Sequence, residues 1–268
     1  MVKIAHEAPI PIFDRVQNLT GYDYALVHLF EENEEYYDKF ETAVAINREV
    51  ILDNSIFELG TAFDSDRFAY WVEKLKPTYY IIPDVLEDMV GTLNNFDNWM
   101  KTYKDLPGQT IAVAQGKTYE DFIDCYEYLV SKVDKIAISF DYSFFNDWVE
   151  MYDIQPATKY HAWVYGRQLL LKMMDQDSVL RHDVPHHLLG CGLPQEFAAY
   201  KDYYFIDSID TSNPVMAGIK GWFYNGIKGL EDKPKEKLFT LIDYQPSKSE
   251  MLAIEYNINM FWRIVNDK

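Results

Sequence analysis

Short runs of β-branched and aromatic residues recur along the chain, and each run ends in one or more polar residues. The runs lie at 2–6, 24–29, 50–54, 79–84, 110–116, 135–140, 186–192 and 204–210. Longer stretches with the apolar spacing of amphipathic helices separate most of them, as at 64–76, 92–106 and 119–133. Near-continuous apolar strands that alternate with helices are typical of a parallel sheet covered on both faces. The pattern therefore predicts an α/β fold.

Eight such strands in 268 residues favour a (β/α)₈ TIM barrel over an open sheet. A doubly wound sheet is the alternative, but no glycine-rich phosphate loop follows any of the runs. We therefore expect a single barrel domain over residues 1–268, with a C-terminal helix at 247–265.

Active sites of such barrels form at the carboxyl ends of the strands. A single Asp after a strand is more often a turn former or a helix N-cap than a catalyst, so the set carries more weight than any member. The polar residues expected at these ends are His28, Asp53, Asp84, Gln115, Ser139, His186 or His187, Asp207 and Asp210.

The charge of the chain bears on its partners. It has 43 acidic and 25 basic side chains, a formal net charge of −18, and 48% hydrophobic residues, which is ample for a core. Proteins that bind nucleic acid gain affinity by neutralising phosphates, so this charge argues against such a partner unless basic residues cluster locally. The densest cluster, at 218–237, contains Lys220, Lys228, Lys233, Lys235 and Lys237.

Membrane and metal binding are not expected either. No apolar run approaches the roughly 18–20 residues that span a bilayer, and the N-terminus lacks the apolar core of a signal peptide. We expect a soluble, cytoplasmic protein with no membrane partner. Cys125 and Cys191 are too few for a disulfide framework or a four-thiolate zinc site, and no carboxylate stands at ligand spacing from His182, His186 and His187. We expect no metal and no cofactor.

Five segments, in chain order, resemble motifs of the tRNA-guanine transglycosylase (queuine or archaeosine tRNA-ribosyltransferase) superfamily. LDNSIFELG at 52–60 is similar to its Asp-Ser-Gly-Gly-Phe/Tyr-Gln segment, IPDVLED at 82–88 to its base-reading segment, and AVAQGKTYEDF at 112–122 to its Val-Gln-Gly run. HHLLGCGLPQEF at 186–197 resembles His-x-Leu-Met/Leu-Gly-x-Gly-x-Pro, and IDSIDTSNPV at 206–215 resembles Asp-x-x-Asp. That superfamily exchanges a guanine base in nucleic acid for a 7-deazaguanine on a (β/α)₈ barrel.

The resemblance implies a role for particular residues. Asp210 would be the nucleophile and Asp53 the general acid and base of a double displacement through a covalent Asp–sugar intermediate. A carboxylate suits this role, since it attacks an anomeric carbon with oxocarbenium character, as in retaining glycosidases. The substrate-binding residues that the resemblance implies are Asp84 and Gln115 at the edge of the base, Phe57 and Leu189 on its two faces, and Gly190 close against it.

The chain also departs from the superfamily. Residues 193–268 contain no cysteine, and Tyr256 stands where the zinc histidine would be, so the zinc subdomain is missing. Ile56 replaces a glycine beside the base, and TSNPVMAG at 211–218 has no arginine. The chain is most similar to the short, zinc-free DNA 7-deazaguanine transglycosylases of phages and bacteria. This implies a transferase (pentosyltransferase) of DNA modification, with DNA and a 7-deazaguanine base as partners, in the host cytoplasm if phage-encoded.

Two other functions stay open. An N-glycosidic hydrolase or base-exchange enzyme acting on a small nucleoside or nucleotide would suit the acidic charge and the missing arginines. A non-catalytic partner subunit is the other alternative, and the presence of both Asp53 and Asp210 argues against it. The sequence also leaves open the inserted base, DNA against tRNA as acceptor, and whether the chain forms a homodimer or joins a partner subunit.

Overall fold

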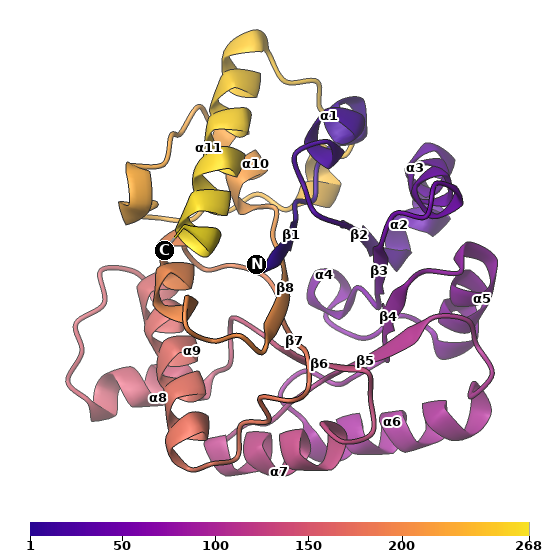
Figure 1. The fold of residues 1–268 in the computed structure, drawn as a ribbon, viewed down its shortest axis with the longest axis vertical. Helices are drawn as coiled ribbons and strands as arrows, with labels where there is room; N and C mark the ends of the chain where they lie inside the picture. Colours follow the sequence, from indigo (N-terminus) through magenta and orange to yellow (C-terminus); the bar gives the residue numbers. More distant parts are fainter. Residues whose placement is uncertain (268) are drawn as a thin grey trace. The chain divides into compact units, whose positions relative to one another are not determined.

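Eight parallel strands that alternate with helices form the sheet of this protein, whose computed structural model describes residues 1–267. The sheet order is β1-β8-β7-β6-β5-β4-β3-β2, with β1 and β2 at its two ends. The strands are β1 (Lys3–Ala5), β2 (Asp23–Leu26), β3 (Val50–Asp53), β4 (Tyr79–Ile81), β5 (Gln109–Val113), β6 (Lys135–Ile138), β7 (His186–Leu188) and β8 (Ile206–Asp210). This alternation and strand order are those of a (β/α)₈ TIM barrel, so the expected fold class is confirmed (Figure 1).

Helices fill the connections between strands. The α-helices are α1 (Phe13–Gln17), α2 (Val27–Glu32), α3 (Glu34–Ala45), α4 (Ile56–Leu59), α5 (Ser65–Leu75), α6 (Met89–Thr102), α7 (Tyr119–Leu129), α8 (Phe144–Met151), α9 (Lys159–Gln176), α10 (Asn213–Ile219) and α11 (Lys248–Asn266). Four short 3₁₀ helices are η1 (Ile10–Ile12), η2 (Pro194–Tyr200), η3 (Gly226–Lys228) and η4 (Leu238–Leu241). None of the described helices is long and apolar enough to cross a membrane.

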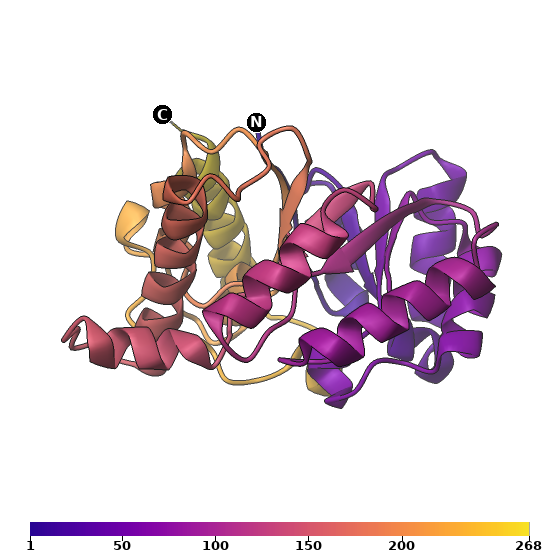
Figure 2. The same cartoon turned by 90° about the horizontal axis from the view of Figure 1, so that it is seen from below.

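Residue contacts divide the chain into two compact units. The first unit comprises Met1–Gly21, Ser139–Asp183 and Leu188–Lys268, and the second comprises Tyr22–Ile138 and Val184–His187. The second unit contains β2 to β6, paired in parallel in chain order. Its outer helices α6 and α7 pack side by side, as the two magenta helices of Figure 2 show.

An aromatic cluster stabilises the helical layer of the second unit. The ring of Phe30 on α2 lies 5.4 Å from Trp71 on α5 and 5.8 Å from Phe40 on α3, measured between centroids. Aspartates begin two of the helices of this unit: Asp64 accepts from the backbone N–H of Arg67, and Asp88 accepts from that of Gly91. These two carboxylates are therefore N-caps, which satisfy amides that the first helical turn leaves unpaired.

The first unit has its own apolar core between η1, α1, α10 and α11. α11 lies beside α10 (Figure 1), and its start is fixed by a capping box in which Ser247 and Glu250 bond each other's backbone amides. The buried core residues are Ala8, Ile12, Val16, Val215, Met216, Ile219, Met251, Ile254 and Ile258. The observed helix begins and ends one residue later than the expected 247–265.

Two expectations about the strands were wrong in detail. The run at 24–29 leaves the sheet after Leu26, and His28 lies in α2 rather than at a strand end. This run is buried throughout, so its apolar pattern fits a strand and a helix equally well. His186 and His187 open β7 instead of following it. They are buried there, where Nε2 of His186 lies 2.9 Å from the Tyr126 hydroxyl and the His187 ring stacks on Tyr24.

We expect the α10–α11 contact to tolerate no side chain at Gly218. A Cβ atom there would lie 2.5 Å from the backbone nitrogen of Ile254, so one helix would have to move. Gly218→Ala should lower the free energy of unfolding by about 1–3 kcal/mol, as measured by urea denaturation. The control is Gly21→Ala, whose Cβ would meet its nearest neighbour at 3.5 Å and should change stability by less than about 0.5 kcal/mol. Equal stability of the two variants would contradict this packing.

Candidate functional site

In the second unit, Asp53 is the last residue of β3 and lies in a sharp turn. Ser55 has a left-handed backbone (φ 60°), and its N–H donates to Oδ2 of Asp53 at 2.8 Å. The Ser55 hydroxyl in turn accepts from the backbone N–H of His28 at 3.3 Å. All three side chains are buried. The carboxylate of Asp53 is therefore held in a defined orientation by its own turn, as short Asx turns do.

Asp84 lies between two side-chain amides. Nδ2 of Asn54 donates to its Oδ1 and Nε2 of Gln115 donates to its Oδ2, each at 2.7 Å. Burial raises the pKa of Asp84, and the two amide hydrogen bonds counteract part of that rise. Each carboxylate oxygen has two lone pairs and uses one of them here. A hydrogen bond from its own backbone also reaches this carboxylate, which leaves acceptor capacity for an N–H group such as the edge of a guanine-like ring presents.

Gln115 has a second role that the sequence did not predict. Besides donating to Asp84, it accepts from the backbone N–H of Glu87 through Oε1 at 3.0 Å, so both ends of its amide are occupied. Only the second hydrogen of Nε2 is left for the expected bond to a base carbonyl. Gln115 is thus first of all an orienting group for Asp84.

The expected stacking residue Phe57 lies on α4, directly after the turn that holds Asp53. Its side chain is 43% exposed, whereas the neighbouring Ile56 is buried. The ring therefore presents apolar surface outside the core, as a residue that stacks on a planar ligand must.

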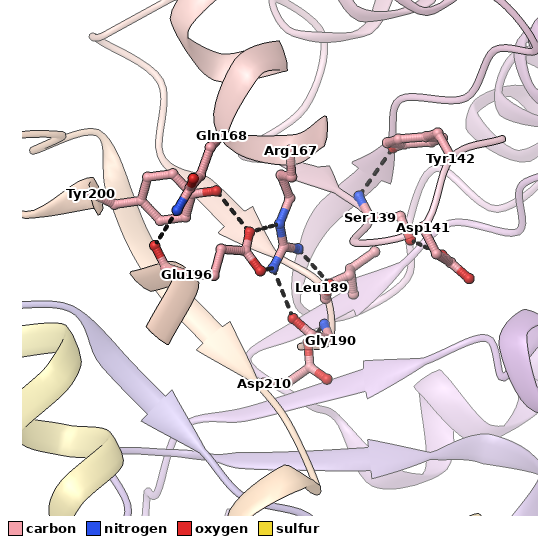
Figure 3. Close-up of polar contacts among 10 residues, drawn as sticks. All are labelled: Ser139, Asp141, Tyr142, Arg167, Gln168, Leu189, Gly190, Glu196, Tyr200 and Asp210. Carbon is pink, nitrogen blue, oxygen red and sulfur yellow. Dashed lines mark hydrogen bonds and ion pairs between the residues drawn. The ribbon is translucent and has the colours of Figure 1, made fainter. Parts of the chain in front are cut away.

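In the first unit, Asp210 is the last residue of β8, and Oδ1 of its carboxylate accepts from the backbone N–H of Gly190 at 3.1 Å (Figure 3). Gly190 has a positive φ of 62°, and a Cβ atom there would lie 2.5 Å from Cδ1 of Phe140. Glycine is required here, because it adopts the positive φ without strain and has no Cβ atom to clash with Phe140. Leu189, the other residue implied at the base, is half-buried and follows β7 directly.

His6 lies next to Asp210, although the sequence assigned it no role. It follows β1, whose Ala5 is in register with Asp210, and its Nδ1 donates to the Thr211 carbonyl at 3.0 Å. The pKa of His6 is lowered to about 4, because burial outweighs both this hydrogen bond and the charge of Asp210. The ring is therefore neutral at pH 7, with its proton on Nδ1 and an acceptor lone pair on Nε2.

The lysines of 218–237 do not form one exposed basic surface. Lys220 forms an ion pair with Glu236. Lys233 is half-buried, with Nζ 4.4 Å from the centroid of the Phe140 ring. Burial lowers the pKa of Lys233, against the opposing effect of several anionic groups, among them Asp141 and Asp210. Lys228, Lys235 and Lys237 are exposed.

Metal-binding geometry is not found in residues 1–267: no three His, Cys, Asp or Glu side chains among them are arranged to hold an ion. Cys125 and Cys191 are free and buried, and burial raises the pKa of both thiols.

Other polar residues that the sequence singled out have partners or lie within a strand. His182 pairs with Asp175 at 2.8 Å. Asp207 lies within β8, and Ser139, just after β6, donates to Asp141.

The chain matches no protein-family model and no curated protein. The functional argument therefore depends on the residues themselves.

The residues that sequence reasoning missed are those that orient the candidate carboxylates. These residues are Asn54, Arg167 and Glu196, to which the sequence pattern assigns no role. The sequence does contain one indication for Arg167. It precedes Leu170 and Leu171 by three and four residues, which places it on the apolar face of α9. A charged residue at such a position needs a buried partner.

We expect His6 to make the folded protein less stable in mild acid. The unfolded chain binds a proton near pH 6.5 and the folded one only near pH 4, so stability from this group is lost as pH falls between these values. The loss should reach about 2 kcal/mol between pH 7 and pH 5. His6→Asn retains a donor for the Thr211 carbonyl but has no titrating group. Between pH 7 and pH 5, the free energy of unfolding of this variant, measured by urea titration, should therefore fall by about 2 kcal/mol less than that of the wild type. Parallel pH profiles of the two proteins would contradict the lowered pKa.

Proposed function

We propose that this protein is a guanine transglycosylase-like enzyme that exchanges a guanine base in nucleic acid, DNA rather than tRNA, for a 7-deazaguanine. One observation carries the proposal. Each residue that the family resemblance assigns to the chemistry or to the edge of the base lies at or just beyond the carboxyl end of its own strand. Asp53 ends β3, Asp84 and Gln115 follow β4 and β5, and Asp210 ends β8. This is where active sites of (β/α)₈ enzymes form.

In the proposed reaction, a carboxylate oxygen of Asp210 attacks C1′ of the sugar as the bond from C1′ to the guanine nitrogen breaks. Asp53 gives its proton to the departing guanine. It then takes a proton from the incoming 7-deazaguanine, whose nitrogen displaces Asp210 from C1′ and regenerates the free carboxylate. Two inversions leave the configuration at C1′ unchanged. The Gly190 N–H fixes the plane of the attacking carboxylate, which contributes orientation rather than bond making.

Base recognition is assigned to the amide-held carboxylate of Asp84. Guanine and 7-deazaguanines share an edge that carries a ring N–H next to an exocyclic amine, and the Asp84 carboxylate is an acceptor that its neutral amide partners leave without a cation. Adenine offers a ring acceptor at the corresponding position and would be repelled. The exposed ring of Phe57 would stack on one face of the base and Leu189 would contact the other.

A small nucleoside or nucleotide is the runner-up substrate. The net charge of −18 opposes the approach of a polyanion, and the pairing of Lys220 with Glu236 reduces the basic surface further. The same carboxylates would then catalyse base exchange or hydrolysis of a free N-glycoside.

Replacing Asp210 should separate chemistry from binding. Asp210→Ala should reduce incorporation of labelled guanine into a DNA oligonucleotide by about 10⁴–10⁶-fold, as loss of a covalent nucleophile does in other enzymes. Wild-type protein should form a covalent DNA adduct on denaturing gels, and Asp210→Ala should form none. Asp207→Ala is the matched control, since Asp207 is a half-buried carboxylate on the same strand, three residues earlier. Exchange by Asp210→Ala at the wild-type rate would show that Asp210 is structural.

Replacing Asp84 should affect the base and not the sugar. Asp84→Ala should weaken binding of free guanine by about 1–3 kcal/mol in calorimetry, because ring N–H groups would lose their buried acceptor. Exchange assays with an oligonucleotide, a tRNA and a free nucleoside in parallel identify the acceptor. Nucleoside mass spectrometry of DNA and tRNA from cells with and without the gene provides the same answer in vivo. Activity on the free nucleoside alone would establish the runner-up.

A further inference from the structure

A buried ion pair joins α9 to η2 in the first unit. Nε of Arg167 donates to Oε1 of Glu196 at 2.6 Å, and Nη2 donates to Oε2 at 3.1 Å (Figure 3). The Tyr200 hydroxyl also donates to Oε1 at 2.7 Å. Neither charged side chain is exposed. Burial alone would lower the pKa of Arg167, but Glu196 more than reverses this, so the guanidinium is a permanent cation.

The same guanidinium binds two successive carbonyl groups of the loop after β7. Nη1 donates to the Leu189 oxygen at 2.8 Å, and Nη2 donates to the Gly190 oxygen at 3.1 Å. One side chain thereby fixes the orientation of two peptide groups. Lysine could not replace it, because an ammonium has neither the planar fork nor enough donors in fixed directions.

The first of these peptide groups is also the one that holds Asp210. The Leu189 carbonyl and the Gly190 N–H belong to a single planar trans peptide, so they point in opposite directions. Arg167 bonds the oxygen side of this peptide, and Asp210 bonds the N–H side at 3.1 Å. A hydrogen bond to the carbonyl also polarises the N–H of the same peptide and makes it a better donor to a carboxylate.

We propose that Arg167, anchored by Glu196, is a positioning residue for Asp210 that acts through the Leu189–Gly190 peptide. Its part in catalysis rests on the proposed function, whereas its effect on the peptide does not. Arg167 orients the peptide, the peptide N–H orients the Asp210 carboxylate, and the left-handed conformation at Gly190 makes this turn of the chain possible. A residue on α9 thereby sets the direction of the attacking oxygen at the end of β8.

The kinetic test uses Arg167→Lys, which keeps the charge but loses the fork. We expect kcat for base exchange to fall about 10–100-fold, because misplacing a reacting group by about an ångström reduces the rate on that scale. KM should change less than about threefold. Glu196→Gln, an isosteric change, should have the same effect to a smaller degree. Arg48→Met is the control, because it removes an ion pair to the buried Asp23 (2.9 Å), far in sequence from the loop after β7. It should lower Tm without lowering kcat.

The structural test does not need activity. The sequence contains two Leu–Gly pairs, Leu59–Gly60 and Leu189–Gly190, so ¹³C-carbonyl leucine with ¹⁵N-glycine labelling gives two amide signals. Asp210→Asn identifies the Gly190 signal, since Gly190 N–H bonds Asp210 whereas Gly60 N–H bonds the Ile56 carbonyl. In Arg167→Lys, the Gly190 amide should shift and exchange with solvent at least about tenfold faster, while the Gly60 amide serves as an internal reference.

The outcomes separate the two proposals. If Arg167→Lys and Glu196→Gln both leave Gly190 exchange and the kcat unchanged, the ion pair only stabilises the fold and the positioning role is wrong. If wild-type protein exchanges no base but the Gly190 amide still loses protection in Arg167→Lys, the proposed function fails and the positioning of Asp210 stands. If Arg167→Lys does not fold, the isosteric Glu196→Gln variant decides by the same two measurements.

Discussion

Parallel pairing of strands is the constraint on which the candidate site depends. Because β3, β4 and β5 pair in parallel, their carboxyl ends lie at one edge, and Asn54 and Gln115 reach Asp84 from the two neighbouring strands. The same constraint acts in the first unit, where Ala5 is in register with Asp210. The residues that follow, His6 and Thr211, are thereby placed within hydrogen-bond distance of each other. In both arrangements, parallel strand pairing brings the segments that carry these groups together.

The sequence predicted the fold class well, because eight apolar runs separated by amphipathic stretches have few alternative arrangements. It located strand boundaries less well, for a physical reason. Residues 27–29 are all buried in α2, and a strand that continued through them would show the same run of buried residues. The burial pattern therefore does not discriminate between a strand and a helix here. Polarity was equally ambiguous at His186, which is polar but finds its partner in Tyr126, a residue 60 positions earlier. A polar residue in an apolar run is therefore not by itself evidence that the strand ends there.

For the candidate site, the sequence indicated the carboxylates and not the groups that orient them. Asp53, Asp84 and Asp210 stand directly after apolar runs, where a local pattern reveals them. The groups that orient them could not be found in this way, because Arg167 and Glu196 are 29 residues apart and Asn54 reaches Asp84 across 30. Such pairs are set by which strands become neighbours and by side-chain direction. A charged residue on the apolar face of a helix, as Arg167 is on α9, indicates that a partner exists but not what it is.

The buried carboxylates of this protein differ in what compensates for their burial, and the difference separates structure from recognition. Glu196 is paired with the full opposite charge of Arg167, and this attraction compensates for the free-energy cost of burying its carboxylate. Asp84 instead accepts from the neutral amides of Asn54 and Gln115, and burial raises its pKa. A carboxylate in that state gains more from two additional N–H groups than one already paired with a cation, because its charge is still largely uncompensated. The placement of neutral amides beside Asp84, and of a guanidinium beside Glu196, therefore favours Asp84 over Glu196 as the carboxylate of the proposed base site.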